Sequence, residues 1–364
     1  MFNDYYQGKN VLITGHTGFK GSWLSIWLTK LGANVTGYAL NPPTDPSMFE
    51  QCKIDTRINS IIGDIRDRDN LNKAISQTQP EIIFHMAAQP LVRLSYEKPV
   101  ETFETNMMGT VNLWEAVRRC PSVRAVVNVT TDKCYENKES FWGYRETDRL
   151  GGYEPYSSSK ACSELITASY INSFFHPDQY NNHKVAIATA RAGNVIGGGD
   201  FALDRLIPDC VRGLLSNEEL LIRNPHAIRP WQHVLEPLTG YLQLAMGLGL
   251  EGCRYNGSWN FGPEKDSEKN VEFIVKQICN LWNGNSSYRI DARQQPHETS
   301  YLKLDSYKAR KLLGYESQLS IEKALKMVVD WVRVYKNDKE NLYDFTLSQI
   351  TEYEKFSRKL NSGE

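Results

Sequence analysis

Residues 10–21 read Asn10-Val11-Leu12-Ile13-Thr14-Gly15-His16-Thr17-Gly18-Phe19-Lys20-Gly21. The run from Asn10 to Thr14 is short and apolar, as expected for a buried parallel strand. Three glycines spaced three residues apart follow, and an apolar periodic segment then predicts a helix from about Ser22 to Leu31. In a dinucleotide-binding unit, such glycines let the backbone approach a pyrophosphate at the helix N-terminus. Alone, the GxxGxxG spacing is equally compatible with a turn that binds nothing.

Four further apolar runs follow, and they predict strands over 34–39, 60–65, 81–85 and 123–129. Helices are expected between them, at 66–75 and at 107–119, where Asn106 is expected to begin the helix. This alternation predicts an α/β fold with a Rossmann-like doubly wound parallel sheet. From Asn194 the alternation stops, which predicts a smaller C-terminal α+β lobe.

Composition excludes several classes of protein. A net charge of −1 over 364 residues provides no basic surface for nucleic acid. Seven cysteines, an odd number without a CxxC pair, indicate free thiols in a reducing compartment, and no metal site is predicted. No apolar run approaches the ~20 residues that span a bilayer, and the polar segment Met1–Asn10 does not have the pattern of a signal peptide. The sequence therefore predicts a cytoplasmic protein.

The second predicted strand ends at Tyr38-Ala39-Leu40-Asn41, without the carboxylate that usually binds the adenosine ribose. No arginine stands there to receive a 2′-phosphate either, so this position does not decide between NAD and NADP. Asp64, after the third strand, is placed either to accept from an adenine amino group or to cap the helix that follows.

The fourth predicted strand is followed by Met86-Ala87-Ala88-Gln89, whose small side chains suit the close approach of a cofactor. His85 at the end of that strand is interpreted as a core histidine with satisfied hydrogen bonds, in preference to a functional one.

The fifth predicted strand ends at Thr130-Thr131-Asp132-Lys133, at the edge where open α/β sheets bind ligands. Tyr156 follows 24 residues after Asp132, and Lys160 stands four residues further, on one face of a predicted helix that runs to about Tyr170. A lysine beside a phenol lowers the pKa of the phenol, so Tyr156 can take a proton from an alcohol near neutral pH.

Together these stretches resemble the extended short-chain dehydrogenase/reductase superfamily, and within it the sugar-nucleotide 4,6-dehydratases. Later stretches extend the resemblance over essentially the whole chain; they are 191–200, 224–238 and 260–263. Most such dehydratases have glutamate after the Thr-Asp step. Lys133 stands there instead, which resembles the branch of the family that acts on CDP-D-glucose.

The resemblance implies one bound NAD and an elimination that yields CDP-4-keto-6-deoxyglucose, in deoxysugar biosynthesis for lipopolysaccharide O-antigen. It implies that Tyr156 takes the proton of the 4-hydroxyl, that Lys160 stabilises the phenolate, and that Thr131 binds the 4-oxygen. Asp132 must be protonated to donate to the leaving 6-hydroxyl, which requires a raised pKa. Lys133 either takes the C5 proton as a neutral amine, which we slightly favour, or stabilises the enolate by its charge while another group takes the proton. The alternative is that Lys133 is an exposed lysine with a structural role only.

The implied binding residues fall into two groups. Those expected to bind the cofactor are Gly15, Thr17, Gly18, Phe19, Lys20, Gly21, Asp64, Ile65, Ala87, Ala88, Gln89 and Asn106, with Tyr156 and Lys160. Those expected to bind the substrate are Arg191, Asn194, Arg205, Arg229, Arg293 and His297. Arg229 is the strongest candidate for the pyrophosphate, because a guanidinium matches phosphate oxygens in a bidentate manner.

The expected domains are an NAD-binding domain over 1–193, also receiving about 224–262, and a substrate lobe over 194–223 and 263–350. Residues 351–364 are expected to form a polar tail. The expected partner is the small-molecule substrate, and the superfamily's habit implies a homodimer through the helices 107–119 and 156–170, or a homotetramer. Alternative functions are another sugar-nucleotide 4,6-dehydratase, a 4-epimerase, and a non-catalytic NAD-sensing regulator.

Overall fold

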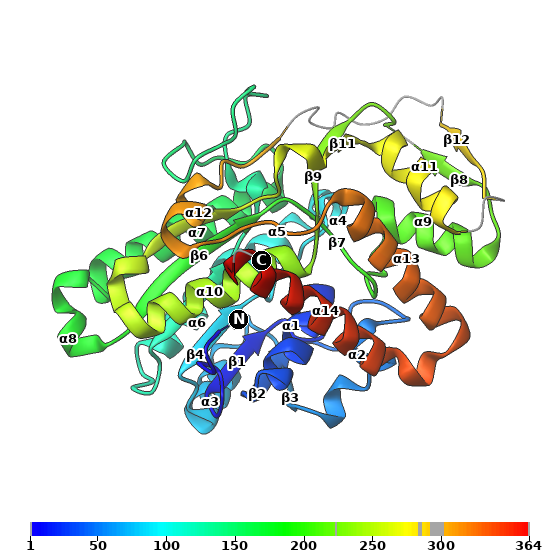
Figure 1. Ribbon diagram of the computed structural model, residues 1–364. Coiled ribbons are helices and arrows are strands. Elements are labelled where there is room, and N and C mark those ends of the chain that lie inside the picture. Colours follow the sequence, from blue (N-terminus) through cyan, green and yellow to red (C-terminus); the bar gives the residue numbers. More distant parts are fainter. Residues whose placement is uncertain (1, 223, 283–285, 292–301, 363–364) are drawn as a thin grey trace.

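A seven-stranded parallel sheet forms the centre of the protein, in a computed structural model that describes residues 2–222, 224–282, 286–291 and 302–362 (Figure 1). The strand order is β10-β6-β5-β4-β1-β2-β3, so the doubly wound Rossmann-like sheet is confirmed. The strands are β1 (Asn10–Thr14), β2 (Asn34–Ala39), β3 (Asn59–Ile62), β4 (Ile82–His85), β5 (Ala125–Val129), β6 (Ala186–Ala192) and β10 (Gly257–Phe261).

Helices cover both faces of this sheet, because alternate strand residues point to opposite sides. Val11 and Ile13 of β1 pack in the same core as α1 (Phe19–Lys30) and α10 (Leu235–Glu251). Leu12 packs in the core on the other face, against α3 (Arg68–Thr78) and α6 (Gly109–Val117), beside which lies α7 (Pro155–Phe174). The uninterrupted apolar runs of the sequence predict such strands, whose residues are apolar on both faces of the sheet.

Three expected boundaries were wrong. Helix α1 begins at Phe19, directly after Gly18, rather than at Ser22. Helix α3 is capped by Asp67, whose side chain accepts from the backbone N–H of Asn70, so Asp64 is not its cap. Asn106 does not begin a helix. It lies in a π-helical turn (Glu104–Met108) that joins α5 (Pro99–Phe103) to α6, because Pro99 has already opened the helix.

A second, smaller lobe contains two further sheets. Strand β9 (Ile228–His233) pairs with β7 (Asn194–Ile196) and with β11 (Glu268–Asn270), while β8 (Leu220–Ile222) pairs with β12 (Tyr288–Ile290). Within the range 224–262, which was expected to join the first domain, β10 pairs in the central sheet and β9 pairs in the smaller sheet. The helices of this lobe are α9 (Leu206–Ser216), α11 (Val271–Trp282) and α13 (Ile321–Asn337). The other helices are α2 (Met48–Gln51), α4 (Val92–Glu97), α8 (Tyr180–His183), α12 (Tyr307–Leu313) and α14 (Leu342–Ser362).

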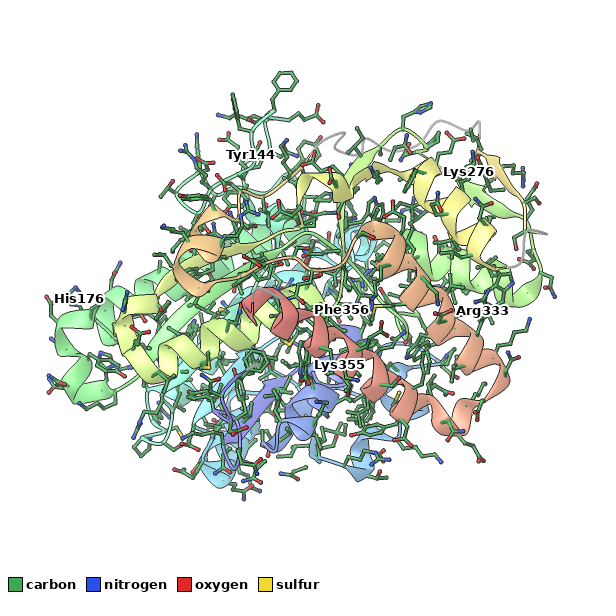
Figure 2. All side chains as sticks on the ribbon, in the orientation of Figure 1. Tyr144, His176, Lys276, Arg333, Lys355 and Phe356 are labelled. Carbon is green, nitrogen blue, oxygen red and sulfur yellow. The ribbon has the colours of Figure 1, made fainter. Side chains whose placement is uncertain are left out.

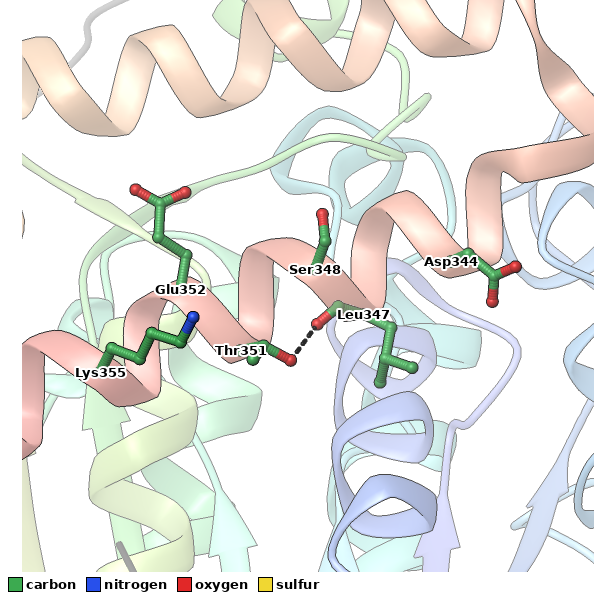
Figure 3. A pocket seen from close by; sticks show the side chains of 6 residues that line it. All are labelled: Asp344, Leu347, Ser348, Thr351, Glu352 and Lys355. Atoms are coloured by element: carbon green, nitrogen blue, oxygen red, sulfur yellow. Dashed lines mark hydrogen bonds between the residues drawn. The ribbon is translucent and has the colours of Figure 1, made fainter.

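Helix α14 includes residues 351–362 of the expected polar tail, and part of this stretch is packed against the fold. Tyr353 is fully buried, and Glu354 accepts hydrogen bonds from the indole of Trp27 at 2.8 Å and from the ammonium of Lys30 at 2.5 Å, both on α1. A shallow hollow on the same helix is lined by Asp344, Leu347, Ser348, Thr351, Glu352 and Lys355 (Figure 3). None of the predicted site residues lines this hollow, and we assign no function to it.

All seven cysteines are free thiols, as expected. Among the residues that the structure describes, no helix is both long enough and apolar enough to cross a membrane.

Glu236, at the start of α10, joins three parts of the fold through its carboxylate. One oxygen accepts from the backbone N–H groups of Gln318 and Leu319 at 2.8 and 2.7 Å, and the other accepts from the hydroxyl of Tyr353 at 2.8 Å. Burial raises the pKa of Glu236 to about 7, although these hydrogen bonds lower it. Ionising Glu236 at neutral pH therefore costs stability.

Because the folded pKa lies above the unfolded value of ~4.3, the contribution of Glu236 to stability is fully present below that value. It is lost as the pH rises through about 7. We expect the free energy of unfolding in urea to fall by up to about 3 kcal/mol between pH 5 and pH 8. Glu236→Gln should remove most of this dependence, whereas the exposed control Glu352→Gln should keep it. An unchanged pH dependence in Glu236→Gln would contradict the assignment.

Candidate active site

The predicted site residues lie at the carboxyl ends of the central strands. Between β1 and α1, Gly15 has a positive φ of +80°, and a Cβ there would lie 2.7 Å from the backbone N of Ala87. A Cβ on Gly21 would lie 2.2 Å from the carbonyl oxygen of Gly15. Packing within the protein therefore explains these two glycines.

Gly18 is different, because a Cβ there would meet nothing nearer than 3.5 Å. Gly18 is the N-cap of α1, a helix of 12 residues, where free backbone N–H groups favour an anion. Its missing side chain leaves a cradle that the protein does not fill, and this fits the pyrophosphate of a dinucleotide. In the same loop, Thr17 is buried and donates from its hydroxyl to the carbonyl of Leu40 at 2.9 Å.

The segment after β4 is held by buried hydrogen bonds. The hydroxyl of Thr14 accepts from the backbone N–H groups of Met86 and Ala87 at 3.1 and 3.2 Å, and it contacts Nδ1 of His85 at 2.7 Å. His85 is fully buried, which confirms its interpretation as a core histidine. The small residues Ala87 and Ala88 therefore follow directly after β4 beside the glycine turn, where the backbone of Ala87 closely approaches Gly15.

Asn106 fixes the same segment from the other side. Its side chain accepts from the backbone N–H of Gln89 at 2.8 Å and donates to the carbonyl of Gln89 at 3.0 Å. It also donates to the hydroxyl of Ser159 on α7 at 2.8 Å. Asn106 is buried, so the structure gives it a positioning role between the 86–89 segment and α7.

Leu40 follows the last residue of β2 and Ile62 is the last residue of β3; both side chains are exposed, and Asp64 lies two residues after Ile62. The Asp64 carboxylate forms a forked ion pair with Arg66 at 2.6 to 3.0 Å, and this hydrogen bonding lowers its pKa. Adenine has a flat ring and an amino group that can donate to a carboxylate, so exposed apolar side chains near an ionised Asp64 are compatible with it. The cofactor role of Asp64 stays a prediction. Ile65 is buried and packs where a side chain on Gly109 would stand.

Tyr156 and Lys160 lie one turn apart on α7, whose first turn is fixed by Glu154. The Glu154 carboxylate accepts from the backbone N–H groups of Tyr156 and Ser157 at 2.7 and 3.1 Å. Lys160 is buried and donates to the carbonyl of Val129, the last residue of β5, at 3.0 Å. Burial lowers the pKa of Lys160 to about 8. The pair is thus anchored to the strand that carries Thr131 and Asp132.

The environment of the phenol differs from the expectation in one respect. Burial raises the pKa of Tyr156 to about 12, while a hydrogen bond from Thr131 and the charge of Arg205 lower it. In this structure the cation that acts on the phenol is therefore Arg205, while Lys160 is directed at Val129. Arg205 is held by Asp200 at 3.0 Å, and the Asp200 carboxylate is almost fully buried. Sequence reasoning missed Asp200, since only its contact with Arg205 gives it a role.

Thr131 and Asp132 begin a short 3-10 turn after β5. The Thr131 hydroxyl donates to Oδ1 of Asp132 at 3.0 Å, and both side chains are buried. Burial raises the pKa of Asp132, although Lys133, the hydrogen bond from Thr131, Lys20 and Arg229 lower it. The direction is the one that a general acid requires.

Lys133, next along the turn, is exposed. The protein therefore does not supply the desolvation that a neutral Lys133 would need.

Lys20 and Arg229 also bring positive charge to Asp132, although one lies on α1 and the other on β9. Burial and the charge of Arg205 lower the pKa of Lys20 to about 8. Three cations thus surround the predicted acid.

The structure corrects the expected role of Arg191. This side chain is 1% exposed, and its guanidinium donates to the Glu164 carboxylate at 2.9 and 2.7 Å and to the hydroxyls of Tyr135 and Ser258 at 2.6 and 2.8 Å. Tyr135 in turn stacks on Tyr144, labelled in Figure 2. Every nitrogen of the guanidinium has a protein partner, so Arg191 is a core residue beneath the site and not a phosphate ligand.

The other predicted substrate residues are only partly placed. Asn194 opens β7 and lies opposite Trp231 of β9, half-buried. Arg229 lies two residues before Trp231 on that strand, and its positive charge lowers the pKa of Asp132. Arg293 and His297 lie outside the described residues.

Comparison with known proteins agrees with this geometry. Residues 12–328 match the family described as GDP-mannose 4,6 dehydratase. The chain is 53% identical over 332 residues to CDP-glucose 4,6-dehydratase of Salmonella typhimurium, which covers 91% of this chain and 92% of that one. Among solved structures, dTDP-glucose 4,6-dehydratase DesIV from Streptomyces venezuelae, with NAD bound, is similar with a TM-score of 0.75 and 25% identity. That match covers 91% of this chain and 99% of DesIV.

A similarity to the epimerase Mth375 from Methanothermobacter thermautotrophicus, at 24% identity and a TM-score of 0.77, concerns the fold alone and covers 92% of this chain and 96% of that one. The family match spans most of the chain, and the Thr131–Asp132 and Tyr156–Lys160 pairs meet at one strand end as in the predicted site. The resemblance drawn from the sequence is confirmed. This chain belongs to the GDP-mannose 4,6 dehydratase family, among the short-chain dehydrogenase/reductase sugar-nucleotide dehydratases and epimerases.

Proposed function

We propose that the chain is a CDP-D-glucose 4,6-dehydratase that converts CDP-D-glucose to CDP-4-dehydro-6-deoxy-D-glucose and water, in deoxysugar biosynthesis. The observation that carries this proposal is the contact of Tyr156 with Thr131 and of Thr131 with Asp132. It supports a proton acceptor for one hydroxyl and a proton donor for another that act on the same substrate. The 53% identical relative named for this activity supports the choice of CDP-D-glucose.

The chain's own residues fit NAD. The cradle at Gly18 would take the pyrophosphate, and Asp64 would lie beside the adenine. The small residues Ala87 and Ala88 leave room for the nicotinamide end, near Lys160. When bound, NAD+ supplies the hydride acceptor for C4 and returns the hydride to C6.

The protein's part is to move protons at named atoms. Tyr156 takes the proton of the 4-hydroxyl once its own phenol is ionised, which the charge of Arg205 favours and burial opposes, and Thr131 holds the 4-oxygen. Once C4 is a ketone, the C5 proton is acidic and the 6-hydroxyl can leave. Asp132 donates a proton to that hydroxyl, as its raised pKa allows.

Lys133 is proposed to act by its charge. Its exposed position argues against the neutral amine favoured from the sequence, because an exposed lysine is not desolvated. A positive charge next to Asp132 stabilises the enolate that forms when a group other than Lys133 takes the C5 proton, and that group returns a proton to C5 at the end of the cycle. The same charge stabilises the Asp132 carboxylate after it has donated.

We propose the oligomeric state from exposed apolar side chains and the cellular location from the free cysteines. Helix α7 and the segment before α6 carry exposed apolar side chains, among them Leu165 and Met108. These surfaces would form the interface of a homodimer, with a homotetramer as the alternative. The free cysteines support a reducing, cytoplasmic location.

The function is tested with CDP-glucose, dTDP-glucose, UDP-glucose and GDP-mannose at equal concentration and saturating NAD+. A 4-keto-6-deoxy product absorbs in alkali, so we expect this absorbance with CDP-glucose at a rate at least about tenfold above the others; a tenfold preference corresponds to about 1.4 kcal/mol. Product without alkali absorbance would indicate a 4-epimerase. A greater rate with another nucleotide sugar would overturn the choice of CDP-glucose and keep the dehydratase.

A further inference from the structure

The turn that carries the predicted acid is held weakly by its own hydrogen bonds. The backbone N–H of Cys134 donates to the carbonyl of Thr131 at 3.3 Å, and that of Tyr135 donates to the carbonyl of Asp132 at 3.4 Å. The backbone N–H of Lys133 donates to the Thr131 hydroxyl at 3.3 Å. All three distances exceed the usual value of about 2.9–3.0 Å for an N–H···O bond. The position of Asp132 therefore depends on contacts outside the turn.

Short hydrogen bonds to one buried ion pair fix both flanks of this turn. Before the turn, the hydroxyl of Thr130 donates to Oε1 of Glu164 at 2.5 Å. After the turn, the hydroxyl of Tyr135 accepts from the guanidinium of Arg191 at 2.6 Å. Glu164 and Arg191 are joined to each other at 2.9 and 2.7 Å. All four side chains are at most 6% exposed, so water does not compete for these bonds.

The ion pair also ties the turn to α7, the helix that carries the predicted base. Lys160 donates from α7 to the carbonyl of Val129 at 3.0 Å. Glu164, one helical turn later, accepts from Thr130, the residue after Val129. The end of β5 is therefore joined to α7 at two successive residues, and these two contacts fix the separation of the turn from the helix.

The Asp132 carboxyl group has little free space on the side of β6. A Cβ on Gly193, directly after that strand, would lie 3.0 Å from Oδ2 of Asp132. Gly193 stands two residues after Arg191. The strand whose arginine holds the flanks therefore also borders the carboxyl group itself.

We infer that Glu164 and Arg191 are positioning residues that hold the Thr131–Lys133 turn where the elimination requires it, an inference that rests on the proposed function. Asp132 must reach the 6-hydroxyl of the same sugar whose 4-hydroxyl faces Tyr156. A shift of the turn against α7 therefore impairs the acid and leaves the base in place. A displacement of about 1 Å can slow a reaction by about 10²-fold.

The positioning role is tested by Thr130→Val, which releases one flank and keeps the ion pair. Valine has the shape of threonine without the hydroxyl. With CDP-glucose and saturating NAD+, kcat should fall by about 10–10²-fold while KM changes little. Because Tyr156 still acts at the 4-hydroxyl, C4 is oxidised while elimination lags. The near-ultraviolet absorbance of reduced nicotinamide should therefore accumulate in this variant above the level in wild type.

Matched variants separate positioning from stability. Thr189→Val also removes a hydroxyl that donates to Glu164, at 2.6 Å, but Thr189 lies within β6 and does not flank the turn. It should lower the melting temperature about as much as Thr130→Val without accumulation of reduced nicotinamide. Thr130→Ser keeps the hydroxyl and should restore most of kcat. If Thr130→Val does not fold, Tyr135→Phe releases the other flank and should give the same kinetic result.

The analogue CDP-6-deoxy-6-fluoroglucose provides the second readout. Fluoride leaves without a proton, so its elimination does not need Asp132, and Thr130→Val should convert this analogue at nearly the wild-type rate. Equal losses of kcat in the two valine variants, or an equal loss with the analogue, would overturn the positioning role while product from wild type upholds the dehydratase. No 4-keto product from CDP-glucose in wild type would instead overturn the proposed function.

Discussion

Tyr156→Phe should reduce turnover of CDP-glucose by about 10²–10⁴-fold, the range for removing a positioned acid–base group. The change deletes only the phenol oxygen, so the proton of the 4-hydroxyl loses its acceptor while the ring keeps its place on α7. Binding of CDP-glucose and of NAD+, measured by calorimetry, should change little, because their pyrophosphates are expected to bind at Arg229 and Gly18, and Tyr156 provides no pyrophosphate contact. The loss should therefore appear in kcat and not in KM.

The matched control is Tyr153→Phe, the same substitution three residues earlier on a side chain that is 88% exposed. It should leave kcat, KM and the melting temperature unchanged. Wild-type turnover in Tyr156→Phe would show that another group takes the proton and would remove the mechanism proposed here.

Arg191→Met should lower the free energy of unfolding by about 3–5 kcal/mol, because it leaves the Glu164 carboxylate buried without its cation. Glu164 is 3% exposed and also accepts from the hydroxyls of Thr130 and Thr189 at 2.5 and 2.6 Å. Urea unfolding followed by fluorescence measures the loss. A phosphate-binding arginine would behave differently: its removal would raise KM for CDP-glucose without changing stability.

Two further variants make the Arg191 result interpretable. Glu164→Leu combined with Arg191→Met removes both charges, so the double variant should be more stable than the sum of the single losses predicts. Arg254→Met breaks the exposed pair of Arg254 with Glu251 and should cost no more than about 1 kcal/mol. A loss in Arg191→Met as small as that of Arg254→Met would contradict the buried-pair assignment.

Local sequence patterns predicted most of the fold and part of the site. The apolar runs predicted the strands because buried parallel strands are continuous in sequence, and the glycine spacing predicted the turn before α1 because the backbone there is crowded. Tyr156 and Lys160 were found because four residues on a helix fix their relative position. These features depend only on neighbours in the chain.

The errors involve contacts between distant parts of the chain. Arg191 follows a strand, where an arginine can equally reach a ligand or a buried partner, and Glu164 lies 27 residues away on α7. The placement of β9 depends on its pairing with β7 and β11, which no local pattern encodes. Helix α14 has a polar sequence, yet Glu354 contacts α1 at the other end of the chain and Tyr353 contacts α10, more than 100 residues earlier. Such contacts become visible only in three dimensions.

The contact between α1 and α14 also bears on how the protein is made. Trp27 follows the glycine turn and is fully buried, yet its indole meets Glu354, which lies 327 residues further along the chain. At roughly 5–20 residues per second, a ribosome needs about 16–65 s to synthesise that stretch. During this interval the nascent chain exposes the aromatic side of its first helix, a surface that chaperones bind. The nucleotide-binding half therefore cannot reach its final packing until translation of α14 is complete.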